Sequence, residues 1–106
     1  MSRILLVDDD SGSALILRSR LSAREHEVTL AESGARSLAL AREQRFEAVL
    51  VSAHLKRGID AVETCKRMRA IPEQLGAALL MYSQESERPE HPERAFEAGS
   101  IGRAHV

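Results

Sequence analysis

The chain alternates between short apolar runs and longer stretches with helical periodicity. Continuous apolar runs lie at residues 4–7, 48–51 and 77–82, and a weaker run, interrupted by Thr29, lies at residues 28–31. Runs of this kind, rich in Leu, Ile and Val, are typical of strands that are buried on both faces of a parallel sheet. We therefore predict four strands at these positions.

The segments between the runs carry apolar residues at helical spacing. The first predicted helix is capped by Asp10 or Ser11, and its apolar face holds Ala14, Leu17 and Leu21. The second follows a capping Ser33. The third spans residues 61–70, and its predicted buried stripe is Val62, Cys65 and Met68.

The last part of the chain is less regular. Pro92 suits the first turn of a short helix through Glu97, and Gly99 is expected to end that helix. Residues 100–106 hold little apolar content, so any fifth strand there is weak. The whole of residues 1–106 is expected to form one domain.

Strands that alternate with helices predict an α/β fold, a doubly wound parallel sheet with right-handed crossovers. Ligands of such sheets bind beyond the carboxyl ends of the strands. Asp8, Asp9 and Asp10 follow the first strand, while Ser52 and Ser83 follow two later ones. Two of the carboxylates could hold a hard cation such as Mg²⁺, or they could cap the helix and face solvent.

Composition narrows the classes of function. Fifteen Lys and Arg balance sixteen Asp and Glu, so nothing favours nucleic acid binding. No apolar run is long enough for a membrane span or a signal peptide. A single cysteine, Cys65, excludes an internal disulfide and favours a reducing compartment, so we expect a cytoplasmic protein. Its position on the helical stripe indicates a small core residue.

The ordered series of motifs over about residues 2–100 resembles the receiver (response-regulator) domains of bacterial two-component signalling. The motifs are, in chain order, the strand and acidic residues at 4–10, the strand at 26–31 with Ser33 and Gly34, the strand at 46–51, the loop at 58–61, the strand and hydroxyl at 79–83, and the segment at 95–99. The resemblance implies a flavodoxin-like sheet of strand order 2-1-3-4-5.

The resemblance also implies roles for the residues at the strand ends. Asp8 and Asp9 fill the acidic pair that binds magnesium in receivers, and Ser83 fills the position of the switch hydroxyl. Ser52 stands where receivers have the aspartate that accepts a phosphoryl group from a histidine kinase. Val106 falls about where a phosphate-binding lysine is expected.

These departures predict a degenerate pocket. A serine hydroxyl needs a base before it can act as a nucleophile, whereas a carboxylate does not. Ser52 also removes one negative charge, so Mg²⁺ at Asp8 and Asp9 should be weak and no cofactor is required. We expect a pseudo-receiver that is not an enzyme and that signals through a protein partner, a histidine kinase or another signalling protein. In such a pseudo-receiver, Ser52 is expected to be an ordinary polar residue at the end of a strand.

The end of the chain gives a further expectation. Receivers finish with a fifth helix, but only seven residues follow Gly99, so the domain is expected to stop after its fourth helix or fifth strand with the C-terminal helix missing. Part of one sheet face would then be uncovered. Such an apolar patch usually marks an interaction surface, either a homodimer or a partner contact.

One enzymatic alternative stays open. Haloacid-dehalogenase-like phosphotransferases use an aspartate that ends the first strand and a second aspartate two residues on. Asp8 and Asp10 satisfy that spacing, and Ser52 or Ser83 fits the serine of that family. The chain offers neither the lysine nor the later acidic cluster that the family needs.

Overall fold

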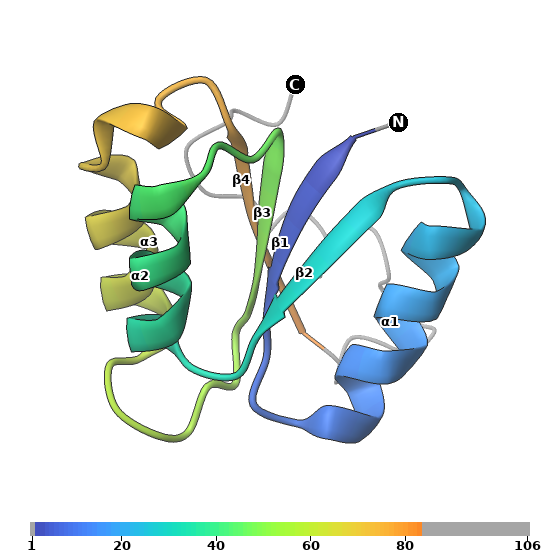
Figure 1. The fold of residues 1–106 in the computed structure, drawn as a ribbon. Coiled ribbons are helices and arrows are strands. Elements are labelled where there is room, and N and C mark those ends of the chain that lie inside the picture. The colour runs from blue at the N-terminus through green and yellow to red at the C-terminus, as the bar shows by residue number, and fades with distance from the viewer. Residues whose placement is uncertain (1, 84–106) are drawn as a thin grey trace, which may run out of the picture.

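The sheet consists of four parallel strands, and the structure, a computed structural model, describes residues 2–83. The strands are β1 (Arg3–Val7), β2 (Glu27–Ala31), β3 (Ala48–Ser52) and β4 (Ala78–Tyr82), in the spatial order β2-β1-β3-β4 (Figure 1). Each predicted strand is present within one residue at either end. The predicted order is confirmed over these four strands. The predictions of a fourth helix, a weak fifth strand and an absent C-terminal helix concern residues outside the described range.

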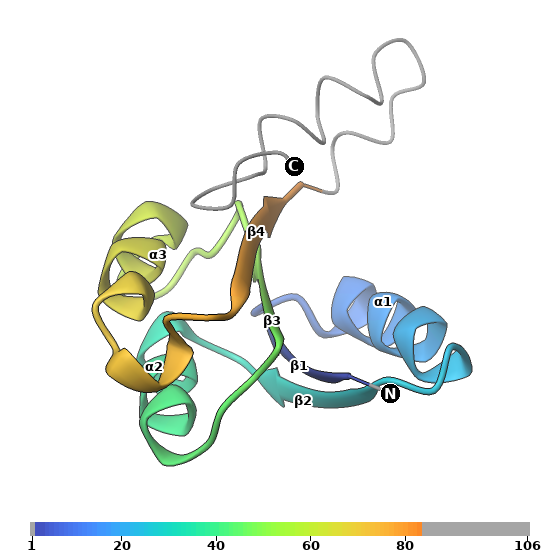
Figure 2. The same ribbon diagram turned by 90° about the horizontal axis from the view of Figure 1, so that it is seen from above.

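Helices cover both faces of the sheet, as a doubly wound fold requires. The helical elements are α1 (Ser11–Ala23), α2 (Gly34–Glu43), α3 (Ala61–Arg69) and the short 3-10 helix η1 (Pro72–Gln74). Figure 2 shows α1 on one side of the sheet and α2 and α3 on the other. None of the helices between residues 2 and 83 is long and apolar enough to cross a membrane.

The predicted caps are present. The side chain of Asp10 accepts the N–H of Gly12 at the start of α1, and that of Ser33 accepts the N–H of Arg36 at the start of α2. These side chains satisfy amide groups that have no partner within the helix. The sequence therefore specifies where both helices begin.

The main core lies between the sheet and the α2–α3 layer. It includes Leu5, Val7, Val49, Val51 and Leu79, which alternate along their strands with residues of the opposite face. On that opposite face Ile4 and Leu6 are buried, whereas Leu50 on β3 and Leu80 on β4 are only half-buried. Among the described helices, α1 covers this face at β1 and β2 (Figure 2).

The predicted stripe of α3 is wrong at one position. Val62 is 53 % exposed, and the buried face of the helix is made by Ala61, Thr64, Cys65 and Met68. Thr64 was not expected in a core, but its hydroxyl donates to the carbonyl of Asp60 at 2.8 Å and is therefore satisfied. Cys65 and Met68 lie in the predicted stripe, but Ala61 and Thr64 complete the buried face in place of Val62.

Gly34 marks a close approach between α2 and the region of α3 within one helical layer. A Cβ atom at this position would lie 2.3 Å from Oγ1 of Thr64 and 2.7 Å from Cγ1 of Ile59. Both distances are too short for non-bonded atoms. The first turn of α2 can therefore pack against α3 and its preceding loop only because residue 34 has no side chain.

Candidate functional site

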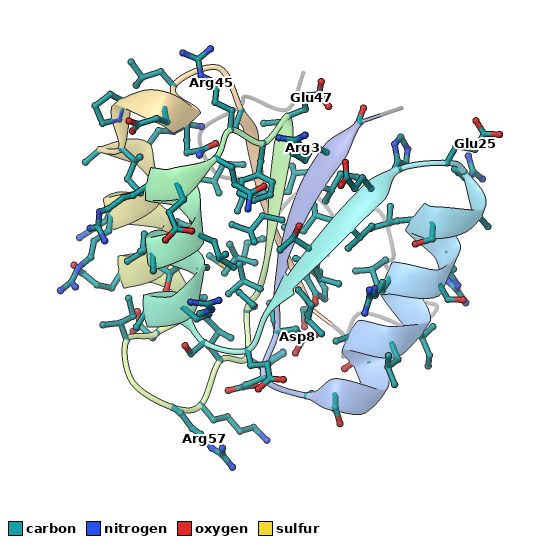
Figure 3. All side chains as sticks on the ribbon, viewed as in Figure 1. Arg3, Asp8, Glu25, Arg45, Glu47 and Arg57 are labelled. Carbon is teal, nitrogen blue, oxygen red and sulfur yellow. The ribbon has the colours of Figure 1, made fainter. Side chains whose placement is uncertain are left out.

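The predicted site residues gather at the carboxyl edge of the sheet. Asp8 follows β1, Ser52 ends β3 and Ser83 follows β4. Figure 3 shows Asp8 at the opposite end of the sheet from Arg3 and Glu47. The edge is thus the one at which α/β sheets hold ligands.

Strand register places three residues of this edge in one row. Val7 pairs with Val51, so the next residues, Asp8 and Ser52, are level with each other; Ser52 in turn pairs with Tyr82. Residues that pair across parallel strands direct their side chains to the same face of the sheet. Asp8, Ser52 and Tyr82 therefore share a face, with Ser52 in the middle.

Asp8 is a buried carboxylate with both oxygens engaged. It is 2 % exposed, its Oδ1 accepts the N–H of Asp10 at 2.9 Å, and its Oδ2 accepts the hydroxyl of Tyr82 at 2.5 Å. A buried charge needs such partners, because each unmatched oxygen would lose its hydration without compensation. Asp8 is thus held by the protein itself.

Tyr82 is a site residue that the sequence did not reveal. Burial raises the pKa of its hydroxyl well above the ordinary value, and the hydrogen bond to Asp8 and the negative charges of Asp8, Asp10 and Asp9 raise that pKa further. The phenol therefore keeps its proton and remains a donor to Asp8. Nothing in the apolar pattern of residues 77–82 distinguishes it from a packing residue.

Asp9 and Asp10 have different surroundings. The half-exposed Asp9 accepts the N–H of Lys56 through Oδ2 at 2.7 Å, which ties the end of β1 to the loop after β3. Asp10 is exposed and caps α1. Of the two interpretations of the acidic run, capping is confirmed for Asp10. The dehalogenase-like alternative needs Asp10 in the pocket and finds no support in this geometry.

The hydrogen bond that Ser52 makes through its hydroxyl is to a donor and not to a base. Ser52 is 3 % exposed, and its Oγ accepts the backbone N–H of His54 at 3.2 Å. A backbone N–H cannot take the proton of a hydroxyl, so this contact does not activate Ser52 as a nucleophile. The imidazole of His54 instead lies 2.7 Å from Oγ of Ser83, measured from Nε2.

The donor set does not match a tight magnesium site. Mg²⁺ sheds its water reluctantly and is held by charged oxygen ligands in octahedral geometry. Within residues 2–83 no three His, Cys, Asp or Glu side chains come together as a metal site. Asp8 has both oxygens engaged, Asp9 has one engaged, and Ser52 contributes no charge. Weak binding at Asp8 and Asp9 stays a prediction.

A cavity of about 440 Å³ lies at the opposite edge of the sheet. Its charged lining residues carry both signs: Arg3 contacts Glu27 at 3.6 Å, and the carboxylate of Glu47 accepts the backbone N–H of Arg3 at 2.6 Å. Charges of mixed sign leave little net charge to attract a ligand. The predicted site residues lie at the carboxyl edge instead.

Comparison with known proteins agrees with this geometry. Residues 4–102 match the family described as "Response regulator receiver domain". The chain is 32 % identical over 100 residues to the sensor histidine kinase AruS of Pseudomonas aeruginosa, covering 93 % of this chain and 10 % of that protein. It is 35 % identical over 78 residues to the response regulator MprA of a Mycobacterium species, covering 74 % and 34 %.

Solved structures give the same fold. The receiver domain of the sensor histidine kinase PA1611 from Pseudomonas aeruginosa superposes with a TM-score of 0.75 at 22 % identity, covering 93 % of this chain and 80 % of that one. The chemotaxis protein CheY4 of Vibrio cholerae gives a TM-score of 0.74 at 22 % identity, covering 92 % and 79 %. The chain spans about a third or less of the length of the two curated relatives above.

Proposed function

Because this chain belongs to the response regulator receiver domain family of two-component signalling, we propose that it is a degenerate receiver, a protein-interaction module that works without aspartyl phosphorylation. The observation that carries the proposal is Ser52. It occupies the end of β3 beside Asp8, at the position that the resemblance assigns to the phosphate acceptor.

The chemistry of Ser52 supports this proposal. Its hydroxyl is neutral and so lacks the charge of an aspartate acceptor, and the partner of its Oγ is a backbone N–H, which cannot act as a base. The neighbouring Asp8 already accepts two hydrogen bonds. A carboxylate engaged in this way is a poorer nucleophile than a free one.

The proposed role is non-enzymatic, with a protein as the partner. The relatives named above are a sensor histidine kinase and a response regulator. A histidine kinase or another signalling protein is accordingly the partner we propose, in the cytoplasm, where the buried free thiol of Cys65 stays reduced. A second copy bound over Leu50 and Leu80 stays a prediction that sedimentation can check.

The loss of acceptor chemistry can be tested by treating the chain with acetyl phosphate and Mg²⁺. Intact-mass and peptide mass spectrometry then show whether a phosphoryl group has been added. We expect no added phosphoryl group on the chain, while a receiver that has aspartate at the acceptor position is labelled in the same reaction. A phosphoryl group on Ser52, Asp8 or Asp9 would overturn the proposal.

A further inference from the structure

The acidic pocket contains a hydrogen bond between two strands that are not neighbours. Tyr82 ends β4 and Asp8 follows β1, and β3 lies between these strands in the sheet. The phenol nevertheless donates to Oδ2 of Asp8 at 2.5 Å, across 74 residues of sequence. The contact depends on what β3 places between them.

Ser52 is the residue that β3 places in this row. Adjacent strands lie ~4.8 Å apart, so the backbones at Asp8 and Tyr82 are separated by about 10 Å, which a tyrosine and an aspartate side chain can bridge together. The small side chain of Ser52 leaves room for that bridge. An aspartate at position 52 would add a second carboxylate to the same row.

We infer that the hydroxyl of Tyr82 occupies the acidic pocket at the place where the resemblance to receivers puts a divalent cation. The hydroxyl donates to Asp8 there, so a cation must displace it to use that carboxylate. Ser52 and Tyr82 thus act as a pair. Ser52 takes the place of a charged side chain, and Tyr82 donates a hydrogen bond to the carboxylate of Asp8 that remains. This goes beyond the proposed function, because it holds whether or not the chain accepts a phosphoryl group.

The balance of interactions favours the hydroxyl over a cation. Asp8 is 2 % exposed, and its hydrogen bond to Tyr82 satisfies a buried charge. A magnesium ion would have to break that bond, give up its own water and find only two carboxylates instead of three. Asp9 offers it one oxygen that is not already bound to Lys56.

Calorimetric titration with MgCl₂ at constant ionic strength tests the inference on four chains. They are the native chain, Tyr82→Phe, Ser52→Asp and the double variant. We expect Tyr82→Phe to raise the affinity roughly tenfold in each background, which is the size expected when a competing hydrogen bond to a charged group is removed. Ser52→Asp should raise the affinity as well, through its added charge.

A matched control removes a buried hydroxyl elsewhere. Ser37 on α2 is fully buried and donates its hydroxyl to the carbonyl of Gly34 at 2.7 Å. Ser37→Ala should bind magnesium as the native chain does. A gain in that variant equal to the gain in Tyr82→Phe would overturn the inference, because it would come from general loosening of the fold.

The fluorescence of Tyr82 provides a second measurement. Tyr82 is the one tyrosine of a chain without tryptophan, so ultraviolet emission comes from this ring. Saturating the Ser52→Asp chain with MgCl₂ should raise that emission as the hydroxyl leaves the carboxylate, even if Tyr82→Phe fails to fold. Equal affinities with and without the hydroxyl, unchanged emission on saturation, or no magnesium binding by any of the four chains would each overturn the inference. A phosphoryl-labelled chain, by contrast, would overturn only the proposed function.

Discussion

The side chain of Gln74 accepts the backbone N–H of Phe46 at 3.0 Å and so fixes η1 to the start of the segment that leads into β3. Its Nε2 also donates to the carbonyls of Ala41 and Gln44, each at 2.6 Å. Gln74 is 2 % exposed, and these bonds use both donors and the acceptor of its amide. One side chain thus satisfies the end of α2 and the loop after it.

Replacing Gln74 by leucine should lower the free energy of unfolding by roughly 2–4 kcal/mol, because it leaves one N–H and two carbonyls without partners. Urea denaturation followed by circular dichroism measures the change. Glu73→Ala, at the exposed neighbouring position, should change stability by less than about 0.5 kcal/mol. Equal stability of Gln74→Leu and the native chain would contradict this account.

The buried thiol of Cys65 makes the free energy of unfolding depend on pH in the alkaline range. Burial raises the pKa of its thiol from 9.0 to about 11, although the charge of Arg69 lowers it somewhat. The folded chain therefore keeps the thiol proton at a pH where the unfolded chain has released it. Stability from this group is complete below about pH 9 and is lost as the pH rises toward 11.

Denaturation curves at several pH values between about 8 and 10 check this expectation, since Tyr82 contributes in the same direction only above its ordinary pKa of 10.0. Cys65→Ala should be less stable at neutral pH, having lost packing, but its stability should fall less steeply above pH 9. The same slope in both chains would show that another group is responsible.

Asp10 is predicted to act through helix capping alone. Asp10→Ala should lower the free energy of unfolding by about 1 kcal/mol, whereas Asp10→Asn, which also caps well, should leave it nearly unchanged. Both changes remove the same exposed charge, so each should lower magnesium affinity only slightly. A large loss of magnesium affinity in Asp10→Asn would instead place this carboxylate in the pocket, as the dehalogenase-like alternative requires.

Asp9 is predicted to order the loop after β3. In Asp9→Ala the N–H of Lys56 loses its acceptor, so its hydrogen exchange should become roughly tenfold faster or more. Nuclear magnetic resonance at the Lys56 amide gives the rate. Asp10→Ala serves as the control, because it changes an adjacent carboxylate that does not accept this N–H. An unchanged exchange rate in Asp9→Ala would show that Asp9 does not order the loop.

The sequence predicted the elements well where one local rule sufficed. The run at residues 4–7 is apolar because both faces of β1 meet other layers. Ser33 and Asp10 were identifiable as caps because capping depends on a few consecutive residues. Val62 was misplaced, because the buried stripe of α3 includes a polar Thr64 whose partner is a backbone carbonyl.

The site could be predicted only in part. Asp8, Asp9, Ser52 and Ser83 were expected at one edge, and the parallel register brings them there. The partner of Asp8 could not be foreseen, because Tyr82 lies 74 residues away and reaches it past an intervening strand. No local pattern encodes such a contact; it follows from strand order and from the size of Ser52.

The contact at Gly34 limits how this chain can diversify. Any side chain at that position would collide with Thr64 and Ile59, whichever side chains line the pocket after β1. The constraint at residue 34 comes from packing against Thr64 and Ile59, and neither contact involves the side chain at residue 52. A library that randomises the pocket should yield many folded members, whereas one that randomises position 34 should retain glycine almost exclusively.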